Sequence, residues 1–247
     1  MINLTRFTDL VFHYAETSST MNDSDRLLNV LNPLPDNFLV MADIQTSGVG
    51  RNQNTWISRE GGLWFTYCFC VPVVTQQMTL FLGLCLRDAL AELFPVLDDK
   101  LVIKWPNDIL LGNKKLAGIL VLTKHNHLMV GTGINTNNDP DSLLTAFPPI
   151  SLKKTLGFKV SNQAILANFL NHVQTSLKLY NQDHLKPFQD RINSKLFGMG
   201  KFITFTTDNG ILEGRCKGIS EEGTLILESE AGGICRCYSG SITGVKE

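Results

Sequence analysis

The sequence predicts an α+β fold followed by a small all-β domain. Up to residue 197, apolar strand-like runs alternate with longer helical segments that carry an apolar face. From Lys201 onward, four short strand-like runs are separated by turn sequences rich in Asp, Asn, Glu and Gly. Runs spaced by about ten residues are typical of a small barrel. We therefore expect a main domain over residues 1–198 and a β-domain over residues 199–247.

The elements of the main domain follow from apolar periodicity and from residues that cap or break helices. Ser19 or Thr20 can cap a helix that runs to about Leu31, and Ser161 can cap another with an apolar face repeating every 3.6 residues. A third, apolar-rich helix is expected over residues 77–93, ended by Pro95. Strands are expected over residues 38–45, 62–71, 101–105, 109–111, 116–122 and 128–134, with a hairpin turn at Gly112 and Asn113.

Composition excludes several classes of protein. A chain of 247 residues, 43% of them hydrophobic and 18% charged, can bury a core without disulfides. Its 22 Lys and Arg against 23 Asp and Glu give a net charge of -1, which argues against a nucleic-acid partner. No apolar run reaches the ~18 residues of a membrane span, and the N-terminus lacks the features of a signal peptide. We expect a cytoplasmic protein without nucleic-acid or membrane partners.

The cysteines and histidines are not expected to carry the chemistry. Four of the six cysteines form two pairs that read C-x-C, but both pairs fall in strand-like runs and not in the turn-rich knuckles of structural zinc sites. A zinc site built from both pairs is conceivable, whereas buried, reduced thiols are the expectation. His125 and His127 flank a turn and are expected to face solvent.

The loop at residues 47–54, SGVGRNQN, follows a predicted strand. It is not a dinucleotide-binding G-x-G-x-x-G, because Gln53 stands at the third glycine, and it lacks the ending of a Walker P-loop. Two interpretations stay open. The segment is either a plain surface loop, or its glycines let backbone N–H groups approach an anion that Arg51 then clamps.

The segment KWPND (104–108) places a cation, an aromatic ring, an amide and a carboxylate at the end of a strand. The plain interpretation is a strand that ends in a turn, but this inventory also suits a nucleotide or another anion. Glycines within the strands of KKLAGIL (114–120) and GTGIN (131–135) indicate close approach of another backbone or of a ligand. No nucleophile with an adjacent base stands out, so positioning and electrostatics are the expected means of catalysis.

In order and spacing, KWPND, KKLAGIL and GTGIN resemble the signature of the biotin–protein ligase family. ETSSTMN (16–22) and QTSGVGRNQNTW (45–56) resemble its Ser-Thr segment and its glycine-arginine loop. The resemblance implies a mixed central sheet with flanking helices, like class II aminoacyl-tRNA synthetases, and a C-terminal SH3-like β-barrel. It begins near residue 10, so we expect a form without the DNA-binding domain of bifunctional members, as a monomer or a homodimer.

The family's reaction has two steps. ATP, with Mg²⁺, and biotin form biotinyl-5′-adenylate, and a lysine of a biotin carboxyl carrier domain of a carboxylase then takes the biotin. The resemblance assigns catalysis to Lys104 and Arg51, and leaves open whether Asp108 organises the metal, accepts the lysine's proton or caps a turn. It assigns biotin binding to Ser19, Thr20, Met21, Gln45, Gly48, Val49, Gly50, Arg51, Lys104, Gly118, Gly131 and Gly133. It assigns nucleotide binding to Arg51, Trp56, Asn107, Lys115 and Asn135.

The chain departs from the family in the loop at 47–54. Many members carry Arg at Val49, Gly at Gln53 and, in bacteria, Arg at Asn54, so adenylate retention is expected to differ. Two alternatives are a ligase that uses lipoate and a biotin-binding module without activity. The C-terminal β-domain is expected to carry none of the adenylation groups.

Overall fold

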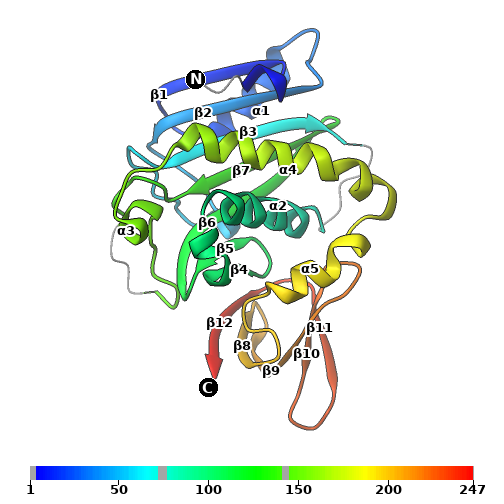
Figure 1. The fold of residues 1–247 in the computed structure, drawn as a ribbon. Coiled ribbons are helices and arrows are strands. Elements are labelled where there is room, and N and C mark those ends of the chain that lie inside the picture. The colour runs from blue at the N-terminus through cyan, green and yellow to red at the C-terminus, as the bar shows by residue number, and fades with distance from the viewer. Residues whose placement is uncertain (1–3, 72–76, 141–144, 247) are drawn as a thin grey trace.

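A seven-stranded mixed sheet forms the main domain of the computed structural model, which describes residues 4–71, 77–140 and 145–246 (Figure 1). Its strands lie in the order β1-β2-β3-β7-β6-β5-β4. Only the pair of β1 and β2 is parallel among these neighbours. The strands are β1 (Leu10–Thr17), β2 (Asn37–Gln45), β3 (Leu63–Cys70), β4 (Leu101–Lys104), β5 (Asp108–Leu111), β6 (Lys114–Lys124) and β7 (His127–Ile134).

Helices cover both faces of this sheet. Two long helices, α2 (Met78–Leu93) and α4 (Asn162–Asp183), pack on one face, and α1 (Thr20–Val30) packs on the other (Figure 1). Ser161 caps α4 as expected, since its side chain accepts a hydrogen bond from the Ala164 N–H. Short helical elements complete the chain: η1 (Leu4–Arg6), η2 (Arg51–Gln53), η3 (Pro95–Lys100), α3 (Leu152–Leu156), η4 (Lys186–Phe188) and α5 (Gln189–Ser194).

The C-terminal β-domain is an antiparallel sheet in the order β11-β10-β9-β8-β12. It has five strands where the patterning predicted four, because the last run divides at residues 238–240. The strands are β8 (Phe202–Thr207), β9 (Gly210–Ile219), β10 (Leu225–Glu228), β11 (Ile234–Cys237) and β12 (Ser241–Lys246).

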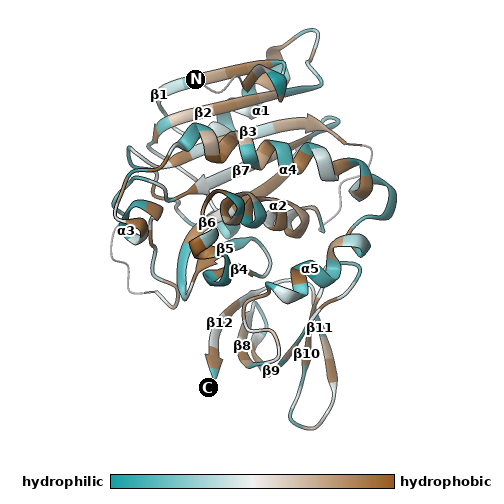
Figure 2. Cartoon of the chain, viewed as in Figure 1, coloured by the Kyte–Doolittle hydropathy of each residue, from teal (hydrophilic) through white to brown (hydrophobic). Residues whose placement is uncertain are grey.

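One hydrophobic core runs through both sheets. The strands of the main sheet are largely hydrophobic (Figure 2), and their face beneath α2 and α4 is continuous with buried residues of the β-domain. At the junction, the rings of Trp105 and Phe205 lie 5.6 Å apart, and the Trp105 indole N–H donates to the carbonyl of Gly223 at 2.9 Å. The two sheets are therefore packed together as one body.

The predicted helices and strands of the main domain are confirmed, but the patterning did not indicate β1. This strand lies at the sheet edge and is half exposed, so it needs no continuous apolar face. The expectation for His127 was wrong, because its ring is buried with Nε2 2.9 Å from the carbonyl oxygen of Pro35. Among the described residues no helix is long and apolar enough to cross a membrane.

The cysteines are all free, and four of the six are buried. The exceptions are Cys70, the last residue of β3, and Cys235 within β11, where the expectation of burial was wrong. Burial raises the pKa of the Cys68 thiol to about 12, which keeps it protonated at neutral pH. Among the described residues no cluster of three or more His, Cys, Asp or Glu side chains could hold a metal ion.

Candidate active site

Two adjoining cavities lie between the main sheet, the loop at residues 47–56 and the C-terminal β-domain. The first has a volume of about 440 Å³ and the second about 330 Å³. Residues of all three parts line both of them, and the two cavities share Thr55, Trp56, Asp108, Lys115, Ser241 and Thr243.

The far end of the first cavity is a fixed polar network at the N-terminus of α1. The Gln45 side-chain oxygen accepts hydrogen bonds from the backbone N–H and the hydroxyl of Thr20, at 2.9 and 3.1 Å. The Gln45 amide nitrogen donates to the Ser58 hydroxyl at 2.7 Å. Ser19 is the N-cap residue that precedes α1, but its side chain makes no capping hydrogen bond. This end of the cavity therefore offers ordered amide and hydroxyl groups to a polar, uncharged ligand.

Glycines on β6 and β7 make room for two side chains along the cavity. A Cβ atom at Gly133 would lie 2.4 Å from the Trp56 indole nitrogen, and one at Gly131 would lie 2.7 Å from the Met21 sulfur. A Cβ atom at Gly118 would lie 3.1 Å from the Trp56 ring. The expected close approach is thus made by Trp56 and Met21, which pack directly on the backbone of the strands.

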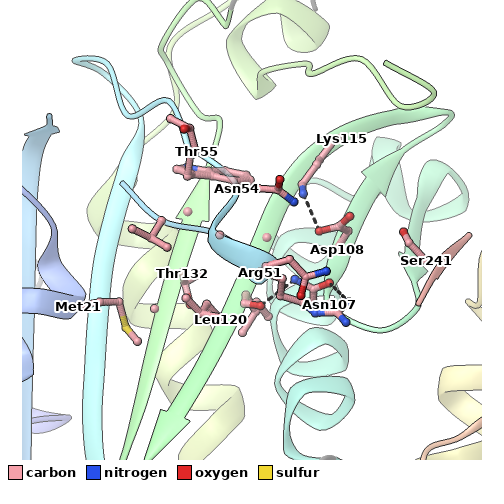
Figure 3. A pocket seen from close by; sticks show the side chains of 18 of the residues that line it. Met21, Arg51, Asn54, Thr55, Asn107, Asp108, Lys115, Leu120, Thr132 and Ser241 are labelled. Carbon is pink, nitrogen blue, oxygen red and sulfur yellow. Dashed lines mark hydrogen bonds and ion pairs between the residues drawn. The ribbon is translucent and has the colours of Figure 1, made fainter. Parts of the chain in front are cut away.

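A buried carboxylate joins two lysines where the cavities meet. Asp108 Oδ2 lies 3.3 Å from Lys104 Nζ, and Asp108 Oδ1 lies 2.8 Å from Lys115 Nζ. Figure 3 shows Lys115 and Asp108 pointing toward each other from neighbouring strands. Burial lowers the pKa of the Lys104 ammonium below its usual range, while the Asp108 carboxylate opposes that shift.

Both lysines also lie near aromatic rings. Lys115 Nζ is 5.1 Å from the centroid of the Trp56 ring, and Lys104 Nζ is 4.9 Å from that of Phe147. The two ammonium groups thus carry one more positive charge than Asp108 neutralises. An anion at the junction of the cavities would meet that excess charge.

Arg51 adds a third cation from the loop. Its Nη1 donates to Asn107 Oδ1 at 3.3 Å (Figure 3), and also to the carbonyl of Gly240 at 3.5 Å. The Asn107 amide nitrogen in turn donates to the carbonyl of Ile119 at 3.0 Å, which fixes its orientation. Burial lowers the pKa of the Arg51 guanidinium, and Asp108 opposes that shift.

The second cavity combines apolar walls with a pair of asparagines. Asn138 donates from its amide nitrogen to the Asn135 side-chain oxygen at 2.9 Å, and both residues are at least 96% buried. The Asn138 side-chain oxygen is buried without a hydrogen-bond partner. Phe147, Pro149 and Ile57 form apolar walls around them. This combination suits a flat, partly polar ring.

Most residues assigned by resemblance come together here. Of the twelve expected at biotin, all except Gly48 and Lys104 line the first cavity, and Lys104 lines the second. A Cβ atom at Gly48 would lie 2.5 Å from the Trp56 carbonyl oxygen, so this glycine serves the loop's own packing. Of the nucleotide residues, Trp56 and Lys115 line both cavities, Arg51 and Asn107 the first, and Asn135 the second.

The sequence analysis missed the contribution of the C-terminal β-domain. Lys104 Nζ donates to the Ser241 hydroxyl at 3.0 Å, and the carbonyl of Gly240 accepts from Arg51. The β-domain thus contacts two residues that the resemblance assigns to catalysis, while the expectation that it carries none of the adenylation groups stays a prediction. Motif reading could not find them, because Ser241 is separated from Lys104 by most of the chain and belongs to no motif.

Comparison with known proteins gives a family for this fold and site. Residues 14–137 match the Biotin/lipoate A/B protein ligase family, and residues 198–243 match the Biotin protein ligase C terminal domain. The chain is 31% identical over 244 residues to the bifunctional ligase/repressor BirA of Bacillus subtilis (strain 168), covering 94% of this chain and 73% of that protein. The chain therefore belongs to the biotin/lipoate A/B protein ligase family.

Other relatives are named as biotin ligases. The biotin--[acetyl-CoA-carboxylase] ligase of Paracoccus denitrificans is 28% identical over 233 residues, covering 88% of this chain and 94% of that protein. The structure of biotin protein ligase from Aquifex aeolicus in complex with biotin and ATP is similar at a TM-score of 0.81 and 28% identity. It covers 96% of this chain and 98% of that one.

Proposed function

We propose that the two adjoining cavities hold biotin and ATP side by side, so that the chain acts as a biotin–protein ligase. The enzyme activates biotin with ATP to biotinyl-5′-AMP and pyrophosphate. It then transfers the biotin to a lysine of a biotin carboxyl carrier domain. The named relatives and the structure with biotin and ATP support this activity.

The observation that carries the proposal is the cation cluster at the junction. Bringing the biotin carboxylate to the α-phosphate costs about 1 kcal/mol per pair of unit charges at 4 Å in water, and about 4 kcal/mol at the effective dielectric of a protein surface. Lys115 borders both cavities, and Lys104 and Arg51 lie beside it. These cations offset the repulsion and stabilise the charge that develops on the phosphate.

Biotin fits the first cavity by its chemistry. Its ureido ring presents N–H donors and a carbonyl acceptor, each of which costs roughly 1–3 kcal/mol if buried unpaired. Ser19, Thr20 and the network around Gln45 supply partners at the far end. The valeryl chain then runs toward Lys115 past Met21 and Trp56, the side chains that cover Gly131 and Gly133.

The adenosine of ATP fits the second cavity, between its apolar walls and the Asn135–Asn138 pair. Mg²⁺ bound to ATP would supply positive charge against the triphosphate. Asp108 is paired with Lys104 and Lys115, and these two ammonium groups would compete with a metal ion for its carboxylate. No step here is assigned to a metal held by the protein.

The test is pyrophosphate release by the purified chain with biotin, with lipoate and with no acid. Release with biotin alone, together with biotinyl-AMP detected by mass spectrometry, is the expected result. Added carrier domain should then become biotinylated on a single lysine. Release with lipoate in place of biotin would overturn the proposal, as would binding of biotin without any pyrophosphate.

A further inference from the structure

The C-terminal β-domain places a hydroxyl directly on a buried cation of the active site. Ser241 is the first residue of β12, and its Oγ accepts a hydrogen bond from Lys104 Nζ at 3.0 Å. Lys104 is 95% buried, and its other acceptor is Asp108. An ammonium has three N–H donors, so these two contacts leave one donor for a substrate anion.

The position of this hydroxyl is fixed by packing on both sides. Trp105, which follows Lys104, packs against the Phe205 ring at 5.6 Å. Gly240, which precedes Ser241, lies against the same ring, because a Cβ atom there would be 2.6 Å from Phe205 Cε1 and 2.5 Å from the Thr206 carbonyl oxygen. Gly240 also has a φ of +130°, which L side chains rarely adopt. One aromatic ring thus sets the distance between Lys104 and Ser241.

The hydroxyl matters because, among the residues that the structure describes, the other groups that hold the Lys104 ammonium are Asp108 and the face of Phe147. Asp108 is shared with Lys115, so it cannot by itself decide which direction the Lys104 ammonium takes. A second, uncharged acceptor orients the ammonium without cancelling its charge. Such preorganisation is how an enzyme makes a cation effective at the charge that develops during reaction.

We propose that Ser241 is a positioning residue for adenylation, whose hydroxyl orients the Lys104 ammonium toward the meeting point of carboxylate and α-phosphate. This proposal rests on the proposed function and goes beyond it, because it makes the C-terminal β-domain part of the adenylation site. In the second half-reaction the acceptor lysine attacks the biotinyl carbonyl and AMP leaves. Carboxylate and phosphate are then already joined, so there is no repulsion between two separate anions to offset, and we expect transfer to depend less on the orientation of Lys104.

The experiment compares the full chain with Ser241→Ala, Ser241→Thr and Thr204→Ala. Thr204 lies in the same domain and its hydroxyl contacts Glu213, away from both cavities, so it is the matched control. Biotinyl-AMP formation is measured by rapid quench. Transfer to a carrier domain is measured separately, starting from supplied biotinyl-AMP.

Loss of a hydrogen bond to a charged group predicts that Ser241→Ala slows adenylate formation about ten- to a hundredfold. We expect KM for biotin and for ATP, the transfer rate and the unfolding temperature to stay near their wild-type values. Ser241→Thr should recover most of the rate, and Thr204→Ala should equal wild type.

Equal adenylation rates in Ser241→Ala and wild type would overturn the inference and leave the proposed function intact. A parallel fall in both half-reactions, with a lowered unfolding temperature, would overturn it too, since that marks a general structural role. A wild-type chain that forms no biotinyl-AMP would overturn both.

Discussion

At the scale of single residues, Asp108 has a role that its motif did not indicate. The sequence left it as a metal organiser, a proton acceptor or a turn cap, and the structure places it in β5 between Lys104 and Lys115. Breaking a buried ion pair by removing one partner costs about 3–5 kcal/mol, because the other charge stays buried. Asp108 is therefore best understood as the anion that keeps two cations inside the site.

Asp108→Asn tests that role. The amide keeps the shape but removes the charge that opposes the lowered pKa of Lys104. We expect adenylate formation to fall by at least tenfold at pH 7 and to recover in part at lower pH, where Lys104 regains its proton. Asp139→Asn is the control, because Asp139 is an exposed partner of Lys153. Stopped-flow pyrophosphate release between pH 6 and 9 gives the answer, and a rate independent of the substitution at every pH would contradict this role.

Arg51 is the residue on which retention of the adenylate is predicted to depend. Loss of a charge-assisted contact costs about 1.5–3 kcal/mol, or roughly ten- to a hundredfold in retention. Arg51→Gly should still form some adenylate but release it faster, so that lysines of bystander proteins become labelled. The dissociation rate of preformed biotinyl-AMP measures this directly. If the rate matches wild type, Arg51 does not retain the adenylate, and the loop at 47–54 does not hold it through this residue.

The same loop shows why some family positions favour glycine. Asn52 and Gln53 have φ values of 53° and 58°, in the left-handed region that costs most residues about 1 kcal/mol or more. Glycine adopts this region freely, which fits the glycine that the resemblance leads us to expect at position 53. The motif indicated that a glutamine at position 53 departs from the family pattern. It could not indicate the backbone strain at Asn52 and Gln53, because that strain depends on φ angles that a sequence motif does not contain.

At the scale of elements, the strands that carry motifs could be predicted, and the elements without a strong pattern could not. The segments of β5, β6 and β7 were recognised from apolar runs and turn residues, and their glycines indicated a close approach. The edge strand β1 was missed because its burial is irregular, and its position depends on parallel pairing with β2. Pairing between distant segments leaves little trace in either sequence.

Gly133 of β7 gives a test at this scale. Gly133→Ala would place a methyl group 2.4 Å from the Trp56 indole, which must then move and lose its contact with Lys115. Overpacking typically costs 1–3 kcal/mol, so we expect KM for ATP to rise about five- to a hundredfold. Gly83→Ala in α2 is the control, since a Cβ there meets only Ile103 at 3.8 Å. Isothermal titration of both variants should separate them, and equal affinities would contradict the packing argument.

At the scale of the whole molecule, the C-terminal β-domain is joined to the main domain by a shared core and by the active site. Ile203, Phe205 and Leu225 are fully buried in the cluster that also holds the residues of α2 and α4. Backbone contacts add to this, because Ile219 accepts from Gln189 and donates to Asn193 of α5. The sequence indicated a change near residue 200, from alternating helices and strands to short strands alone. It could not indicate that the two domains bury residues in one core. The domain boundary at residue 198 stays a prediction.

Truncation after Phe197 is therefore expected to disturb both the shared core and the candidate active site. It would uncover the Trp105 ring, now 3% exposed, and would take away the Ser241 acceptor of Lys104. Re-exposing one large apolar side chain costs about 1.5–3 kcal/mol, a substantial part of the 5–15 kcal/mol by which proteins are stable. We expect residues 1–197 to unfold at a markedly lower temperature and to form little biotinyl-AMP.

The control is Trp105→Phe in the full chain, which keeps an aromatic ring in the core but loses the hydrogen bond to Gly223. It should lose some thermal stability and remain soluble. A truncated chain with the wild-type unfolding temperature and adenylation rate would show that the β-domain contributes to neither the core nor the site.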